Sequence, residues 1–318
     1  MRILIIDARR SRVGRSRCVA LAIGFVALLA GCGGGGGGYG SGGGDGPLVV
    51  ATTTQLGDLA RNVAGDRARV RTLLAPNTDP HDYEPRPSAA QDLADAKLIL
   101  RSGGEVDDWL GDLAEGAGAH EPVDVSESLS DVGDDPHWWH DPRNAAVAVE
   151  AIAAALAEAD PDGRAGYERN ARAYAERIRR ADGAIARCMD EVPAAERKLV
   201  TTHDALGHFA RRYGVTAIGS VIPSLSTEAQ PSAADADRLV DQIRGEGVKV
   251  VFAESSVSSE LERAIAEEGG AKVGEPLWAD TLGPEGSSGA TYLDSLAWNA
   301  NAMIEGFSGG RARCRVEV

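Results

Sequence analysis

Short apolar runs alternate with segments of helical periodicity along most of the chain. Leu48–Ala51 is apolar throughout, as expected of a buried strand, and apolar residues then recur at helical spacing from Gln55 to Gly65. The same patterns predict strands at Val70–Leu74, Lys97–Leu100, Lys198–Thr202, Val215–Ile218, Val248–Ala253 and Ala271–Val273, and helices at Ser88–Ala94, Glu105–Ala114, Asn144–Ala159, Ala205–Tyr213, Ala233–Arg244, Ser259–Glu268 and Ala290–Phe307. Because strands alternate with helices, the pattern favours an α/β fold with mostly parallel sheets flanked by helices.

The segment 161–191 has a different pattern. Apolar residues recur there at steps of four and three from Tyr167 to Cys188, which places one apolar stripe on one long helix. About 30 residues would span about 45 Å. A short coiled-coil hairpin is the alternative, but the α/β patterns on both sides favour a rigid linking helix. We therefore predict two lobes, 47–160 and 192–318, joined by the helix 161–191.

The first 46 residues differ from the rest in composition. Residues 1–17 hold six Arg and one Asp, and an apolar run follows at 19–30. That run is shorter than the roughly 20 residues of a membrane-spanning helix, and a basic segment before it is typical of a secretory signal. Residues 29–32 (LAGC) resemble a bacterial lipobox, so we expect a signal peptide at 1–31 and lipidation of Cys32. A short membrane anchor with a chance cysteine is the alternative, and translation could start further in.

The predicted mature chain is strongly acidic and begins with a flexible segment. Eleven of the fourteen residues 33–46 are Gly, so 32–46 would form a lipidated tether with a span of about 20 Å. The full chain has 318 residues, 33 basic and 48 acidic, and loss of residues 1–31 leaves 27 basic and 47 acidic side chains. A hydrophobic content of 43% supports a folded core, whereas the acidic balance argues against nucleic acid as a partner.

Two cysteines remain in the predicted body. Cys18 leaves with the signal peptide and Cys32 takes the lipid, which leaves Cys188 and Cys314 in an oxidising, extracytoplasmic setting. A disulfide between them would close a long loop and stabilise the fold by about 4–5 kcal/mol in loop-entropy models. Sequence alone does not bring their Cα atoms within bridging distance, so the pairing stays open here.

Histidines are few, and several of them follow predicted strands. His81 and His203 come after strands of different lobes, His137 lies in a turn before the helix at 144–159, and Asp280 follows the strand at 271–273. Ligands of open α/β sheets bind beyond the carboxyl ends of the strands, so these four side chains would meet in the cleft between the lobes. Three imidazoles and one carboxylate suit a tetrahedral Zn²⁺ site. Each histidine taken alone is better explained as a polar turn residue, and no short-range metal signature is present.

Five separate motifs resemble the metal-binding lipoproteins that serve zinc and manganese ABC importers. They are VVATTTQLGDL (49–59), DPHDYEPRPS (79–88), DPHWWHDP (135–142), THDALGHF (202–209) and WADTLG (278–283). They occur in the family's order, and the resemblance runs from about residue 48 to 307. It implies a two-lobed fold with a rigid linking helix, in agreement with the pattern at 161–191.

The resemblance implies the metal ligands His81, His137, His203 and Asp280. Zinc members typically carry His at the third position, where manganese members tend to carry Glu, so His203 favours Zn²⁺ with Mn²⁺ as the alternative. The segment 119–135 departs from many zinc members because it holds only one histidine, His120, among several acids. His140, three residues after His137, could compete as an additional ligand, whereas His208 is interpreted as a helix-surface or packing residue.

Carboxylates near the ligands are expected to fix the tautomers of the imidazoles. Glu254, at the end of a predicted strand on the same sheet edge, is the strongest candidate for this role. Asp82, Asp141 and Asp204 are weaker candidates, because helix capping and solvation explain them equally well.

We therefore expect an extracytoplasmic, lipid-anchored monomer that captures Zn²⁺ and delivers it to an ABC permease, and that is not an enzyme. A secreted zinc hydrolase is less favoured, because Asp280 fills the coordination position that such an enzyme keeps open. No sequence feature supports a third class, an adhesin that uses the fold as a scaffold.

Overall fold

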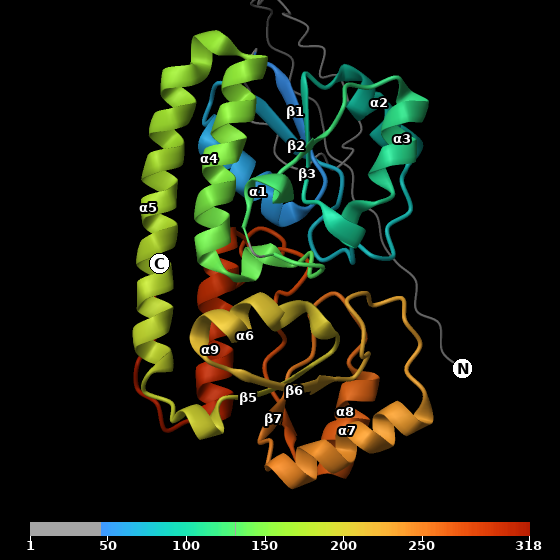
Figure 1. Cartoon of the computed structure of the whole chain (residues 1–318), viewed down its shortest axis with the longest axis vertical. Helices are drawn as coiled ribbons and strands as arrows, with labels where there is room; N and C mark the ends of the chain where they lie inside the picture. The colour runs from blue at the N-terminus through green and yellow to red at the C-terminus, as the bar shows by residue number, and fades with distance from the viewer. Residues whose placement is uncertain (1–45, 131) are drawn as a thin grey trace, which may run out of the picture. The chain divides into compact units, whose positions relative to one another are not determined.

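Parallel strands alternate with helices through residues 46–130 and 132–318, which are the residues that the computed structural model describes (Figure 1). All of them lie within one compact unit, Gly40–Val318. The predicted signal peptide, Cys32 and all of the predicted tether except Gly46 lie outside the described residues. Within the described part of the chain, no helix combines the length and apolar character needed to cross a bilayer.

The N-terminal half is built on a four-stranded parallel sheet with the strand order β2-β1-β3-β4. Its elements are β1 (Leu48–Ala51), α1 (Thr54–Ala64), β2 (Arg69–Thr72), α2 (Pro87–Asp95), β3 (Leu98–Arg101), η1 (Gly104–Asp107), α3 (Leu110–Ala117), β4 (Val123–Asp124), η2 (Ser126–Ser128), η3 (Trp138–His140) and α4 (Pro142–Ala159). In register, Val49 of the central strand β1 lies opposite Val70 of β2 and Leu98 of β3.

Both faces of this sheet are buried, which explains the unbroken apolar run in β1. Val49 and Ala51 belong to the main core with α1, α4 and α5, whereas Leu48 and Val50 pack with Leu93 and other residues of α2 and α3. Successive side chains of a strand point to opposite faces, so a strand covered on both sides must be apolar at every position.

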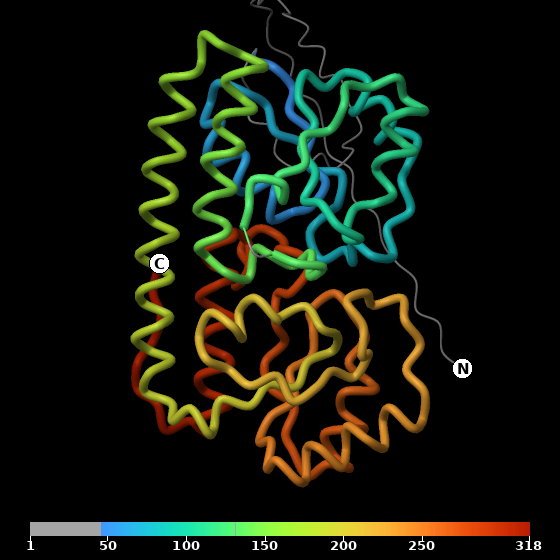
Figure 2. The backbone as a smooth tube through the Cα atoms, viewed as in Figure 1, coloured from blue at the N-terminus to red at the C-terminus, as the bar shows by residue number. Residues whose placement is uncertain are grey.

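A long helix, α5 (Arg164–Met189), lies beside α4 and extends along both halves (Figures 1 and 2). Its buried face includes Tyr167, Tyr174, Ile178 and Ile185. The first three residues of the helix predicted at 161–191 form a separate 3-10 turn, η4 (Pro161–Gly163). The long helix expected from the apolar stripe is therefore present, and it packs against α9 as well as α1 and α4.

The C-terminal half contains shorter parallel strands. Its elements are η5 (Ala194–Glu196), β5 (Lys198–Thr201), η6 (Asp204–Leu206), α6 (Gly207–Tyr213), β6 (Thr216–Ser220), α7 (Ala233–Glu246), β7 (Val250–Val251), α8 (Glu260–Gly269), β8 (Lys272–Val273) and α9 (Tyr292–Ser308). β5 pairs with β6 and β7 pairs with β8. An isolated parallel bridge from Thr201 to Phe252 connects the two strand pairs, and a second from Glu254 to Leu277 continues the pairing of β7 with β8.

Cys188 at the end of α5 forms a disulfide with Cys314 in the segment that follows α9. Their Cα atoms are 5.1 Å apart, within the usual bridging range. The carboxylate of Glu191 also accepts hydrogen bonds from the backbone N–H groups of Arg313 and Cys314. The C-terminal segment is thereby fastened to the end of the long helix.

The predicted α/β fold, with parallel sheets flanked by helices and a long helix, is confirmed, and the differences are local. The single helix expected at 105–114 is divided into η1 and α3. The edge strand β4 was not predicted, because two residues of which one is charged carry no strand pattern.

Candidate metal centre

The four candidate ligand residues lie outside helices and strands, in turns or loops between these elements. His81 is in the loop after β2, and His137 immediately precedes η3. His203 lies between β5 and η6, and Asp280 comes three residues after Leu277, which pairs with Glu254. Three of the four side chains therefore come from segments that follow parallel strands or a parallel bridge, and His137 comes from the turn before η3.

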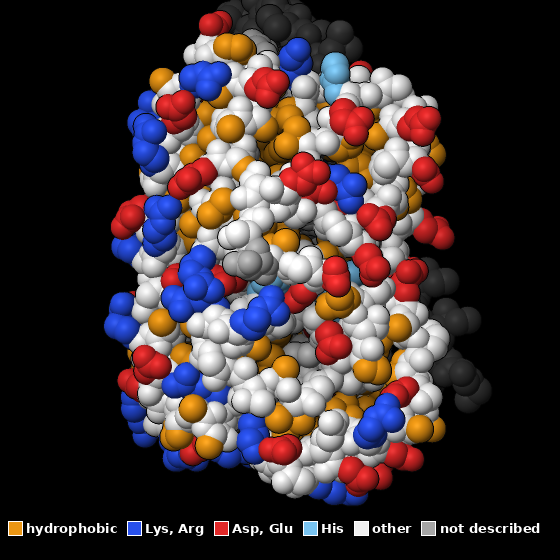
Figure 3. Space-filling view, viewed as in Figure 1, with side chains coloured by type: hydrophobic (Ala, Val, Ile, Leu, Met, Phe, Trp, Pro, Cys, Tyr) orange, Lys and Arg blue, Asp and Glu red, His pale blue; other side chains and the backbone are white. Residues whose placement is uncertain are grey.

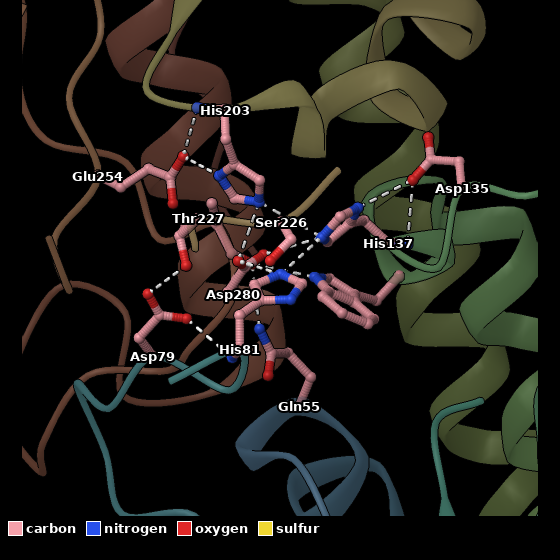
Figure 4. Close-up of polar contacts among 12 residues, drawn as sticks. Gln55, Asp79, His81, Asp135, His137, His203, Ser226, Thr227, Glu254 and Asp280 are labelled. Carbon is pink, nitrogen blue, oxygen red and sulfur yellow. Dashed lines mark hydrogen bonds and ion pairs between the residues drawn. The ribbon is translucent and has the colours of Figure 1, made fainter. Parts of the chain in front are cut away.

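The four side chains converge on one point (Figure 4). Each offers a ligand atom, and all these atoms lie within 4.8 Å of one another. The His137 Nε2 atom is 3.4 Å from the Nε2 atoms of both His81 and His203. The Asp280 carboxylate lies 3.3 Å from His81 Nε2, 3.5 Å from His137 Nε2 and 3.1 Å from His203 Nε2. A tetrahedron of ligands at 2.0–2.1 Å from Zn²⁺ has edges of about 3.3 Å, which matches this spacing.

The hydrogen bonds of two imidazoles show which ring nitrogen is free to bind a cation. His137 Nδ1 is 2.9 Å from Asp135 Oδ1, and His203 Nδ1 is 2.6 Å from Glu254 Oε1. A neutral imidazole that donates from Nδ1 carries a lone pair on Nε2, so the two close Nε2 atoms would repel one another without a cation between them. Carboxylates bonded to the far side of ligand imidazoles are a regular feature of metal sites.

The charge balance also suits a cation. Burial alone would raise the pKa of Asp280, but His203 and His137 outweigh it and hold that pKa well below its usual value. Burial would lower the pKa of His203, whereas the charges of Asp280 and Glu254 raise it well above its ordinary value. Among the residues that the structure describes, no hydrogen bond reaches either carboxylate oxygen of Asp280. A buried anion of this kind needs a positive partner, which a divalent ion would supply.

The Asp280 segment, residues 279–282, is hydrogen-bonded to the N-terminal half. Gln55 at the start of α1 and Trp139 of η3 both donate hydrogen bonds to the carbonyl oxygen of Ala279, at 3.1 and 3.0 Å. The backbone N–H of Leu282 donates to the hydroxyl of Thr54 at 2.7 Å. The fourth candidate ligand therefore comes from the C-terminal part of the sequence, but the segment that carries it is bonded to the N-terminal half.

His140 does not join the group of ligand atoms. It is 2% exposed, and its Nε2 atom has no hydrogen-bond partner among the described residues. Burial, with a smaller contribution from the charge of His137, lowers its pKa to about 3, so the ring stays neutral. Its place within the one-turn helix η3 separates its side chain from that of His137.

Glu254 lies where the sequence places it, whereas the other candidate carboxylates do not contact the imidazoles. Glu254 accepts from both Nδ1 and the backbone N–H of His203, at 2.6 and 3.2 Å. Asp141 caps α4 and pairs with Arg143. Asp82 and Asp204 are exposed.

Asp135, within the motif at 135–142, is a partner of His137 that the sequence analysis does not predict. Its Oδ1 atom accepts from the backbone N–H of His137 at 3.1 Å, as Asp79 Oδ1 accepts from that of His81 at 2.9 Å. The repeated Asp-Pro-His tripeptide is the signal that could have revealed it, because an Asp side chain readily bonds the backbone two residues on.

His208 also supports this turn, from the C-terminal half. It is 3% exposed, so the surface interpretation is wrong and the packing interpretation is correct. Its Nε2 atom is 3.1 Å from the carbonyl oxygen of Asp135. A Cβ atom on Gly207 would lie 2.7 Å from Asp135 Oδ2, so a larger residue there would displace this carboxylate.

Comparison with known proteins gives a consistent result. Residues 49–306 match the model of the family described as zinc-uptake complex component A, periplasmic (ZnuA). The chain is 30% identical over 298 residues to the manganese-binding lipoprotein MntA of Halalkalibacterium halodurans, covering 92% of this chain and 98% of that protein. It is 31% identical over 268 residues to the iron-binding protein YfeA of Yersinia pestis, covering 81% and 86%.

Solved structures give the same picture. The periplasmic zinc-binding protein TroA of Treponema pallidum superposes with a TM-score of 0.75 at 27% identity, covering 82% of this chain and 99% of that one. The printed names of these three proteins mention manganese, iron and zinc, so similarity alone does not select the metal.

Proposed function

The chain belongs to the family of periplasmic zinc-uptake component A proteins, the metal-binding components of ABC importers, and on this premise we propose that it captures Zn²⁺ and delivers it to a permease. Family members are transport components and not enzymes. The observation that supports the proposal most directly is the buried group of His81, His137, His203 and Asp280.

The donor set is the reason for favouring zinc. Three imidazole nitrogens and one carboxylate, spaced at 3.1–3.5 Å, suit a closed tetrahedral shell. A closed shell leaves no coordination position for an activated water, which fits storage and transfer of the ion better than hydrolysis. Mn²⁺ is the second candidate, because the relative with 30% identity is named a manganese-binding lipoprotein.

The remaining parts of the proposal concern the setting of the protein. We propose a signal peptide at 1–31, lipidation of Cys32, a tether at 32–46, lobes at 47–160 and 192–318 with the linking helix 161–191 between them, and a monomeric body outside the cytoplasm. The names of several relatives as lipoproteins support the anchor, and the Gly-rich composition after Cys32 supports the tether.

Metal-dependent thermal stability tests the function. A ligand that binds only the folded state raises the melting temperature by mass action, so one equivalent of Zn²⁺ should raise it markedly near neutral pH. The double variant His81→Ala, His203→Ala should lose this rise. No rise in the wild type, or an equal rise in the variant, would refute the metal site. Parallel titrations with Mn²⁺ decide between the two metals.

A further inference from the structure

The side chains of the metal centre are almost completely sealed from solvent. Those of His81, His137, His203 and Asp280 are 2%, 0%, 0% and 1% exposed. On the face drawn in Figure 3, histidine shows between the two halves only in small patches, apart from one further histidine patch at the top of the view. An ion held at this point cannot leave unless a segment that covers it moves aside. The question is which of the contacts across the cleft controls that movement.

One side of the cleft is fastened by several hydrogen bonds to the Asp280 segment. Ala279 accepts from Gln55 and Trp139, and Leu282 bonds to both Thr54 and Asn77. The Leu282–Asn77 contact is a backbone hydrogen bond of 2.9 Å. Opening here would break all of these bonds together, so this side is the costlier one to separate.

The other side is formed by segment 222–230, which follows β6. This segment is bound to its own half, since Ile222 N–H donates to the carbonyl of Thr202 at 2.7 Å and Asp204 N–H donates to that of Ser224 at 2.9 Å. Its backbone bonds therefore flank His203. Among the described residues, its one hydrogen bond across the cleft joins the hydroxyl of Thr227 to Asp79 Oδ2, at 2.7 Å.

Asp79 connects this contact to a metal ligand. Its Oδ1 atom accepts from the backbone N–H of His81 at 2.9 Å while its Oδ2 atom accepts from Thr227. Figure 4 shows Asp79 and Thr227 beside His81. His81 also lacks, among the described residues, the carboxylate partner on Nδ1 that His137 and His203 have. The cleft is thus closed beside the least supported ligand by a single side-chain hydrogen bond.

We propose that the Asp79–Thr227 hydrogen bond is a latch that closes the exit beside His81 and sets the rate at which the bound metal leaves. The inference rests on the proposed function. Breaking the bond would let segment 222–230 move with its own half, away from the 76–82 loop, without removing any ligand. Thr227 is then a positioning residue, because it acts through Asp79 and does not touch the ion.

The test is a measurement of metal release in the full chain with matched variants. Thr227→Val keeps the shape of the side chain and removes the hydroxyl, Thr227→Ser keeps the hydroxyl, and Thr216→Val removes the hydroxyl of an exposed threonine on β6. Each protein is loaded with one equivalent of Zn²⁺ and mixed with excess chelator in a stopped-flow instrument. The visible absorption of the Co²⁺-loaded forms reports the ligand geometry.

We expect Thr227→Val to release Zn²⁺ about tenfold faster than the wild type, which corresponds to a barrier lower by about 1.4 kcal/mol. Thr227→Ser and Thr216→Val should stay within about twofold of the wild type, and all Co²⁺ spectra should agree. Equal rates in Thr227→Val and the wild type, or equal acceleration in Thr227→Ser, would overturn the latch. A changed Co²⁺ spectrum in Thr227→Val would overturn it too, because the ligands themselves would then be displaced. A wild type that takes up no metal would instead refute the proposed function, and the latch with it.

Discussion

His137 in the N-terminal half and His203 in the C-terminal half present the same ring nitrogen to the same point, but they are supported differently. The partner of His137 is Asp135, two residues earlier in the same turn, with a side chain that is 14% exposed. The partner of His203 is Glu254, 51 residues later and on another strand pair, with a side chain that is 2% exposed. Asp135 is thus close in sequence to its histidine and partly exposed to solvent, whereas Glu254 is distant in sequence and buried.

The difference shows that equal coordination geometry does not imply equal electrostatic support. A charge in a water-excluded place interacts more strongly with its neighbours than the same charge near solvent. Glu254 should therefore stabilise the metal-bound form of His203 more than Asp135 stabilises that of His137.

Removal of the disulfide should lower the stability of the fold without changing how the candidate ligands are held. The double variant Cys188→Ser, Cys314→Ser opens a loop closed over a sequence separation of 126, which should cost about 4–5 kcal/mol of unfolding free energy. For a body of this size we expect the melting temperature to fall by about 10 °C. Calorimetry of the metal-free protein measures the loss, and the Zn²⁺ affinity should change by no more than about twofold. A large loss of affinity would mean that the disulfide, and not Glu254, holds the C-terminal ligand in place.

The direct test of the comparison removes one charge from each half. Glu254→Gln and Asp135→Asn both keep an acceptor oxygen and lose the negative charge. We expect Zn²⁺ affinity to fall by about 10–100-fold for Glu254→Gln and by about tenfold or less for Asp135→Asn, as measured by chelator competition. Equal losses would show that burial of the carboxylate makes no difference, and the reverse order would contradict the comparison.

The pH dependence of metal binding should differ between the same two variants. Ligand imidazoles must be neutral, and the pKa of His203 is raised above its ordinary value, so protons compete with the metal through the neutral range. At pH values below the raised pKa, protonation of His203 stabilises the metal-free protein, and this contribution is lost as the pH rises. The Zn²⁺-induced rise in melting temperature should therefore be smaller at pH 6 than at pH 8.

Removal of the Glu254 charge should lower the pKa of His203 and move this decline to lower pH. Asp135→Asn should leave the pKa of His203 nearly unchanged, so its profile should follow that of the wild type. Melting curves at four or five pH values give the comparison. A Glu254→Gln profile that coincides with the wild type would show that Glu254 does not govern this titration.

Patterns along the chain are enough to predict most of the secondary structure and the four residues that meet. The alternation of strands and helices and the apolar stripe from Tyr167 to Cys188 predict the α/β architecture and α5, because periodic burial is a local property of the chain. The motifs around His81, His137, His203 and Asp280 point to side chains that the structure brings within 4.8 Å of one another. Asp135 was also within reach of the sequence, since the Asp-Pro-His turn is local.

How those residues are held depends on contacts between segments that are far apart in the sequence. The hydrogen bond of Glu254 with His203 joins residues 51 positions apart in the sequence. The bond of Gln55 to the Asp280 segment spans 224 positions, and that of Thr227 to Asp79 spans 148. The burial that keeps His140 neutral is likewise set by packing. The same is true of the short distance between Cys188 and Cys314. The physical reason is that hydrogen bonding and desolvation act over a few ångströms in space, and a pattern along the chain carries no measure of that distance.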